Sequence, residues 1–217
     1  MNTPLLDGLK RFWLALTLAW RHRTEMQRFF KKTPPFAITA LTTVDPTEWV
    51  NEGIRVVILD FDGVLAPHAG EVLPEVAAWL QRLVQVFGNL AAQDKPVTHS
   101  RPIDHNNIFV LTNLPTEARR QYFATQFPQI SLVSVPRKKP YPEGVQEVLR
   151  ITGAHPKQVL LVDDRLMTGI ILAVSTGIRG CWVTAPYADF KQRPFKEAFF
   201  WAMRRLDLLC VKLMLLF

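Results

Sequence analysis

The sequence contains few cysteines and has no long uncharged apolar run. Its 217 residues include two cysteines, Cys181 and Cys210, a number that excludes a disulfide-stabilised scaffold and fits a reducing compartment. No run reaches the roughly 18–20 uncharged apolar residues that a membrane-spanning helix requires. Internal repeats and low-complexity segments are also missing. The length and the 48% hydrophobic content indicate one globular domain with added helices.

The charge of the chain is unbalanced toward the basic side. Lys and Arg number 26 against 19 Asp and Glu, which gives a net charge of +7. Such a charge favours anionic partners: lipid headgroups, nucleic acid or phosphorylated substrates. The sequence lacks interleaved aromatic and basic residues, zinc-ligand spacing and a recognition helix, so no nucleic-acid partner is expected. The polar stretch 91–107 is expected to be an exposed loop and not a metal site.

The N-terminal segment is predicted to form one amphipathic helix over residues 3–32. Basic residues such as Lys10 and Arg28 fall on one face of the helical wheel, and apolar residues such as Phe12 and Leu16 fall on the other. A basic helix that carries tryptophans suits the surface of an anionic membrane, and packing on its own domain or on a partner explains the pattern equally well. Its apolar run is not followed by the small-residue cleavage site of a signal peptide.

Strand and helix patterns alternate from residue 44 onward. Strands are predicted at 54–60, 108–113, 129–135, 157–164 and 178–186, and helices at 45–53, 73–88, 115–127, 142–153 and 166–177. This alternation predicts a three-layer α/β fold with a mostly parallel five-stranded sheet. The predicted domain boundaries are 1–43 for the N-terminal helix and linker, 44–188 for the α/β core and 189–217 for a C-terminal helix.

The last segment, 195–217, is predicted to be helical and is very apolar. Its charged residues, among them Arg204 and Asp207, cover about half of the helical wheel, and large apolar residues cover the rest. So large an apolar face needs to be covered. The α/β domain, a membrane interface and a second subunit are the three candidates, so the sequence leaves the oligomeric state open.

Polar side chains follow four of the predicted strands, at the sheet edge where open parallel sheets bind their ligands. Carboxylates this close together need a neutralising cation, and all-oxygen ligation suits Mg²⁺. A lysine and a hydroxyl nearby can hold phosphoryl oxygens, while one aspartate can act as a nucleophile and a second as an acid and base. The residues concerned are Asp60 and Asp62, Thr112 and Asn113, Lys139, and Asp163 and Asp164.

The same residues carry a resemblance to a family. The sequences DFDGVL, LTN, KKP and VDD, in this order, resemble the four motifs of the haloacid dehalogenase (HAD) superfamily of phosphatases over roughly residues 44–186. The resemblance implies a Rossmann-like HAD fold and an aspartyl-phosphate intermediate. It implies the following roles: Asp60 is the nucleophile; Asp62 is the general acid/base and gives its backbone carbonyl to Mg²⁺; Thr112, Asn113 and Lys139 bind the phosphoryl group; Asp164, with Asp163 as a substitute, completes the Mg²⁺ site.

The chain has no room for a cap domain, the insertion from which HAD enzymes usually gain selectivity for small molecules. Seven residues separate Leu65 from the predicted helix at Leu73, and only one helix and one strand fit between Asn113 and Lys138. An open site suits a large substrate or one presented on a surface. Together with the basic N-terminal helix, it favours a lipid phosphate monoester at an anionic membrane.

A narrower resemblance points the same way. TEWVNEGIRVVILDFDGVLAPH, KKPYPEG and VDDRLMTGI are similar to the cap-less subfamily IIIA, in particular to the YqeG-like group and the mitochondrial phosphatidylglycerophosphate phosphatases of phospholipid biosynthesis. This implies a cytoplasmic, peripherally membrane-associated enzyme, mitochondrial in a eukaryote. The group usually carries asparagine at the position of Gly63 and aspartate at that of Gly169. Losing the aspartate removes a support of the metal ligands, for which Asp163 is a candidate replacement.

Two other classes of function stay open. One is a HAD phosphatase that acts on a soluble nucleotide, sugar phosphate or phosphoprotein, with the terminal helices merely packed on the domain. The other is a non-catalytic HAD-like binding module, which Gly169 favours and the intact pair of Asp60 and Asp62 opposes.

Overall fold

A parallel six-stranded sheet forms the centre of the molecule, in the order β1-β6-β5-β2-β3-β4. The structure is a computed structural model that describes residues 4–31, 37–93 and 107–216. Its strands are β1 (Ala37–Ile38), β2 (Val56–Leu59), β3 (Ile108–Val110), β4 (Ile130–Leu132), β5 (Val159–Asp163) and β6 (Arg179–Val183).

The prediction of five strands is wrong by one. All five predicted strands are present, and the sixth, β1, pairs with β6 through the register Ala37 to Trp182. β1 lies in the segment predicted as linker, and its two residues are too few to show an alternating pattern.

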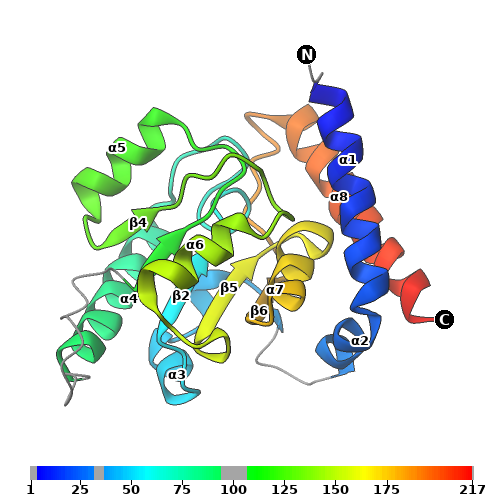
Figure 1. Cartoon of the computed structure of the whole chain (residues 1–217). Helices are drawn as coiled ribbons and strands as arrows, with labels where there is room; N and C mark the ends of the chain where they lie inside the picture. The colour runs from blue at the N-terminus through cyan, green and yellow to red at the C-terminus, as the bar shows by residue number, and fades with distance from the viewer. Residues whose placement is uncertain (1–3, 32–36, 94–106, 217) are drawn as a thin grey trace.

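Helices cover both faces of this sheet, as the three-layer prediction requires (Figure 1). The described helices are α1 (Pro4–Arg21), α2 (Arg23–Lys31), α3 (Pro46–Asn51), α4 (Pro74–Gln93), α5 (Glu117–Gln126), α6 (Glu143–Thr152), α7 (Ile171–Thr176) and α8 (Pro194–Leu215), with short turns at Leu41–Thr43, Pro156–Gln158 and Leu166–Ile170. Along β2, Val57 and Leu59 belong to one core cluster and Val56 and Ile58 to another. The central strands are therefore buried on both sides, which explains their continuous apolar sequence.

No cap domain interrupts the described chain after β2 or between β3 and β4. The chain runs from β2 to α4 without another helix or strand, and between β3 and β4 it forms only α5. The polar stretch 91–107 lies mostly outside the described residues, although α4 extends into it as far as Gln93.

The single helix predicted over 3–32 is wrong, because the chain forms two helices that meet at His22. The change of direction lets α2 bury Met26 and bring Phe30 onto Trp182 of β6, with 6.1 Å between the ring centroids. A straight continuation of α1 would lose this apolar contact. A π-helical turn, Leu166–Ile170, also replaces the first part of the helix predicted at 166–177.

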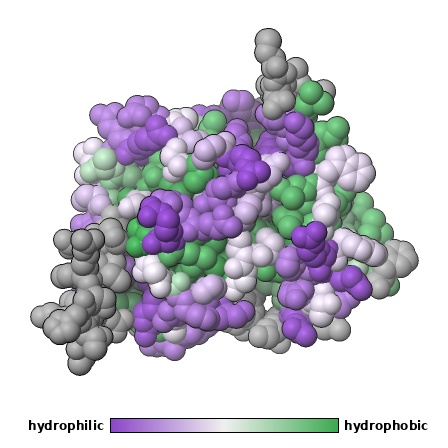
Figure 2. Space-filling view, in the orientation of Figure 1, coloured by the Kyte–Doolittle hydropathy of each residue, from purple (hydrophilic) through white to green (hydrophobic). Residues whose placement is uncertain are grey.

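The terminal helices α1 and α8 lie beside each other on one side of the α/β core, next to α7 (Figure 1). A cluster that includes Ala15, Met167 and Val211 joins them to the π-helical turn. α8 directs charged residues toward the domain, where Glu197 and Asp207 are buried, and leaves Phe195 and Trp201 90% and 53% exposed. Hydrophobic side chains accordingly appear along this edge of the molecule in Figure 2. None of the helices described is long and apolar enough to cross a membrane.

Candidate active site

The predicted site residues meet at the carboxyl edge of the sheet. β5 and β3 lie on either side of β2, so the residues that follow these three strands become neighbours. Asp60, Thr112, Lys139, Asp163 and Asp164 are all buried there.

Lys139 links two of the carboxylates. Its Nζ lies 2.7 Å from Oδ1 of Asp60 and 2.5 Å from Oδ2 of Asp163. Burial raises the pKa of Asp60 well above its usual value, an effect that the Lys139 ammonium opposes. Burial would by itself lower the pKa of Lys139, but the carboxylates of Asp163 and Asp60 outweigh it and raise that pKa. The lysine therefore stays charged between two acids.

Asp62 does not join these carboxylates, because it pairs with Arg119 of α5. The guanidinium donates from Nη2 to Oδ1 at 2.6 Å and from Nη1 to Oδ2 at 3.0 Å, and it stacks 3.8 Å from the ring of Phe61. Burial acts to raise the pKa of Asp62, but the hydrogen bonds and the charge of Arg119 lower it below the usual value. Asp62 is therefore held in its ionised form.

Thr112 and Asn113 lie between the two ion pairs. The Thr112 hydroxyl accepts hydrogen bonds from Arg119 Nη1 at 3.2 Å and from the Leu114 backbone N–H at 3.1 Å. The Asn113 carboxamide oxygen accepts from the Lys139 backbone N–H at 2.8 Å. Both residues fix the loops around the site, and the hydroxyl proton and the amide N–H groups can still donate to a ligand.

Asp164 contacts the C-terminal helix. Nε of Arg204, in α8, donates to Oδ2 of Asp164 at 2.5 Å. Burial raises the pKa of Asp164 to about 6, against the opposing charge of Arg204. Gly63 makes this pair possible, because its φ is +88° and a Cβ there would lie 2.6 Å from Asp164 Oδ2 and 2.8 Å from Arg204 Nη2. A side chain at position 63 would therefore displace the ion pair.

Further contacts hold α8 against the site. Arg165 donates to Asp207 of α8 at 2.7 Å and 3.0 Å. The backbone N–H of His68, in the loop after β2, donates to Oε1 of Glu197 at 3.0 Å. The His68 ring also lies 3.5 Å from the Phe200 ring, centroid to centroid. α8 is thus part of the wall of the site.

Three of the four predicted Mg²⁺ ligands form a group that fits a cation. Carboxylate oxygens of Asp60, Asp163 and Asp164 lie within 4.8 Å of one another. Oδ1 of Asp164 is buried and has no hydrogen-bond partner among the described residues, so it has a free acceptor position. All-oxygen donors suit Mg²⁺. The carboxylate of Asp62 is not part of this group, and its predicted contribution was in any case its backbone carbonyl.

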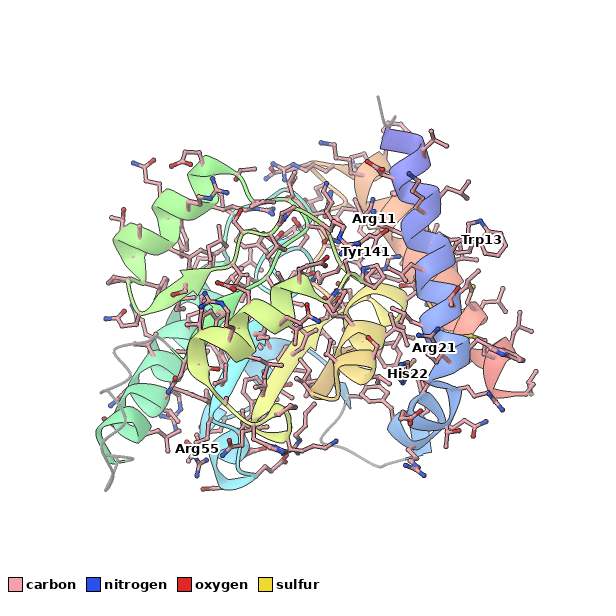
Figure 3. All side chains as sticks on the ribbon, in the orientation of Figure 1. Arg11, Trp13, Arg21, His22, Arg55 and Tyr141 are labelled. Carbon is pink, nitrogen blue, oxygen red and sulfur yellow. The ribbon has the colours of Figure 1, made fainter. Side chains whose placement is uncertain are left out.

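A cavity of about 500 Å³ opens from these carboxylates toward the terminal helices. Asp60, Lys139 and Asp164 line one end of it, and Phe12 of α1 and Phe199 of α8 belong to its wall. Figure 3 shows the side chains in this region between the core and α1.

Sequence reasoning missed Arg119 and Arg204. Arg119 carried a local signal, because a cation in the first turn of a helix is unfavourable unless it is paired. No local feature of the sequence indicates the role of Arg204, because the sequence of α8 does not show which face of the helix contacts the domain. Arg204 and Asp207 were noted only as charges on the helical wheel of the last segment.

The parallel three-layer fold, with the four motifs together at its carboxyl edge, defines a phosphatase of the HAD class. The chain belongs to the mitochondrial PGP phosphatase family, whose model matches residues 27–188. A search of curated proteins gave no significant match. Among solved structures, the chain is similar to a predicted phosphoglycolate phosphatase from Haemophilus somnus 129pt, with 18% identity and a TM-score of 0.39 over 63% of this chain and 88% of that chain.

Proposed function

We propose that this phosphatase is a Mg²⁺-dependent phosphomonoester hydrolase that acts through an aspartyl-phosphate on a membrane lipid, phosphatidylglycerophosphate. The observation that carries the chemistry is the buried group of Asp60, Asp163 and Asp164 with Lys139 between two of its members. It combines a nucleophile, a set of cation ligands and a fixed positive charge at one place.

In the proposed reaction, an Asp60 carboxylate oxygen attacks phosphorus while the bond from phosphorus to the substrate alcohol breaks. Lys139, Thr112 and Asn113 hold the phosphoryl oxygens. Asp60, Asp164 and the Asp62 backbone carbonyl would hold Mg²⁺, with Asp163 as a substitute ligand, and the ion would supply further positive charge. The aspartyl-phosphate is then hydrolysed by water, which regenerates Asp60 and releases inorganic phosphate.

Asp62 is the proposed acid and base of these two steps. It gives a proton to the leaving alcohol and later takes one from the attacking water. Its pair with Arg119 favours the ionised form, which is the form that the base requires. The acid step requires a protonated Asp62, so we infer that the Arg119 pair loosens when the substrate binds.

The outer face of the terminal helices supports a lipid substrate. Phe195, Trp201 and Leu209 of α8 are 90%, 53% and 52% exposed, and Trp13 of α1 is 60% exposed. Arg205 lies 5.2 Å from the Trp201 ring centroid, an arrangement that suits the boundary between headgroups and acyl chains. Because the same helices line the cavity, a lipid phosphate at the membrane surface would lie next to Asp60. This supports peripheral membrane association.

The test measures phosphate release by the wild type and by Asp60→Asn, with Mg²⁺ and with EDTA. The substrates are phosphatidylglycerophosphate in anionic vesicles, a nucleoside monophosphate, a sugar phosphate and a phosphopeptide. We expect Mg²⁺-dependent release from the lipid that Asp60→Asn lowers by about 10³-fold or more. Release from the soluble esters alone would reject the lipid, and full activity of folded Asp60→Asn would reject the nucleophile.

A further inference from the structure

Some of the positively charged side chains that line the cavity form ion pairs with carboxylates of the protein, and two form none with the described residues. Lys139 pairs with Asp60 and Asp163, and Arg204 pairs with Asp164. Arg165, which also lines the cavity, pairs with Asp207. These side chains are therefore compensated at the carboxylate end.

Arg11 and Lys138 line the same cavity, and neither forms an ion pair with any residue that the structure describes. The hydrogen bond given for Arg11 runs from its Nε to the backbone oxygen of Asp7, at 3.4 Å within α1. Its charge is therefore available to a ligand. An arginine can bind a phosphate through two parallel hydrogen bonds.

The two cations come from different parts of the chain that line the same cavity. In Figure 3, Arg11 is labelled on the side of α1 that faces the domain, near Tyr141, whereas Trp13 is labelled on the opposite side. The backbone N–H of Tyr141 donates to the carbonyl oxygen of Lys138 at 3.2 Å, which places Lys138 in the same loop. The cavity thus carries, on α1 and in the loop before α6, two positive charges that form no ion pair with the described residues, in addition to Lys139, which pairs with Asp60.

We infer that Arg11, together with Lys138, forms a second anion subsite that selects phosphate monoesters carrying another anionic group. This inference rests on the proposed function, because the monoester itself must lie at Asp60. In a lipid whose terminal phosphate is joined to a phosphodiester, the diester is that second group. Arg11 lies outside residues 27–188, so α1 adds this selectivity to a site built by the matched part of the chain.

The apolar residues of the cavity wall fit a lipid substrate whose phosphodiester lies at Arg11. Phe12 follows Arg11 on α1, and Phe199 and Met203 of α8 line the cavity as well. With a diester at Arg11, the glycerol and the first carbons of the acyl chains would contact these side chains. The exposed apolar face of the two helices then continues toward the bilayer.

The experiment uses short-chain lipids below their micellar concentrations, so that membrane binding does not contribute. Dihexanoyl phosphatidylglycerophosphate carries the monoester and the diester, and dihexanoyl phosphatidic acid carries the monoester alone. We expect Arg11→Ala to raise the KM for the first by about 10-fold or more, and Lys138→Ala to act in the same direction. The KM for phosphatidic acid should change by less than about twofold, since it lacks the second charge. Arg21→Ala, which removes an exposed arginine from the last turn of α1, is the matched control and should change neither.

The outcomes separate this inference from the proposed function. Equal losses on both lipids, or none on either, would overturn the second subsite and leave the phosphatase chemistry intact. A wild type that releases no phosphate from any lipid would reject the proposed substrate. In that case, calorimetric binding of dihexanoyl phosphatidylglycerophosphate to Asp60→Asn, with and without Arg11→Ala, still decides whether Arg11 binds the diester.

Discussion

The carboxylate of Asp163 occupies the space that a side chain at position 169 would need. A Cβ built on Gly169 would lie 2.0 Å from Cγ and 2.1 Å from Oδ2 of Asp163. Asp163 is completely buried, and the same Oδ2 accepts from Lys139. The two residues are therefore sterically coupled, and Gly169 is required as long as Asp163 keeps this position.

This coupling predicts that Gly169→Ala lowers both stability and turnover. The methyl group must push Asp163 away from Lys139, and overpacking of this kind costs about 1–3 kcal/mol of the free energy of unfolding. Urea denaturation and phosphate release measure the two effects. Adding Asp163→Gly to Gly169→Ala should recover part of the stability, because it removes the clash.

Gly88→Ala is the matched control. Gly88 lies within α4, and a Cβ there would meet no atom within 4 Å. We expect stability to stay the same or to rise by up to about 1 kcal/mol, since alanine favours helix more than glycine does. A Gly169→Ala protein as stable and as active as Gly88→Ala would contradict the coupling.

A second prediction concerns the pair of the buried Arg119 and the partly buried Asp62. Removing Arg119 takes from the Asp62 carboxylate its two guanidinium hydrogen bonds, so Arg119→Ala should lower the free energy of unfolding by about 2 kcal/mol. The double variant Arg119→Ala/Asp62→Asn should be more stable than Arg119→Ala alone, because it leaves no free charge. A double-mutant cycle by urea denaturation measures this coupling, and strictly additive losses would argue against it.

The third prediction links pH to Mg²⁺. The pKa of Asp164 is raised from 3.8 to about 6, so the folded protein binds this proton more tightly than the unfolded chain does. Without metal, the stability that this proton contributes is fully present below pH 4 and is lost as the pH rises through about 6. The pKa of Asp60 is raised as well, which acts in the same direction. Asp62, whose pKa is lowered, stays ionised in this range and does not change the trend.

Mg²⁺ can replace these protons only where the carboxylates are ionised. We therefore expect the rise in melting temperature on adding Mg²⁺ to be small at about pH 5 and clearly larger at about pH 7.5. Thermal unfolding with Mg²⁺ or EDTA across this range measures it, and Asp164→Asn should reduce the difference. An equal rise at both pH values would count against a metal site at Asp164.

The fourth prediction concerns the exposed face of α8. Trp201 is 53% exposed, so its replacement by alanine removes about half of the apolar area that a whole tryptophan side chain could bury in a membrane. Binding to anionic vesicles should therefore weaken about fivefold. Vesicle co-sedimentation measures the affinity, and turnover of a soluble ester in the same samples checks that the site is intact. Unchanged vesicle binding would argue for a protein partner on this face.

Much of the fold could be predicted because its signals are local. β2 is a continuous apolar stretch, and Asp45 starts α3 through a hydrogen bond from the Thr47 backbone N–H, as its position before a proline suggests. Parallel topology then places the residues after the strands at one edge. β1 and the turn at His22 were missed because each depends on what the segment packs against.

The carboxylates of the site and Lys139 were predictable for the same reason, and the arginine partners of Asp62 and Asp164 were not. Arg119 lies 57 residues from Asp62 along the chain, and Arg204 lies 40 residues from Asp164. The choice of partner between such distant residues depends on how α5 and α8 dock on the sheet. Of the three candidates for covering the apolar face of α8, the domain covers only part of it, since Val211 is buried while Phe195 and Trp201 stay exposed.

The docking of α8 has a consequence for the order in which the protein is made. Translation delivers β2, β3, β4 and β5, with all their site carboxylates, before Arg204 and Asp207 exist. A nascent chain at that stage holds Asp164 and Arg165 without their partners, and its cavity is open on the side that α8 will cover. Because domains fold as they emerge from the ribosome, the nascent protein acquires its site carboxylates first. The cavity wall formed by α8, which controls access to these carboxylates, is added last.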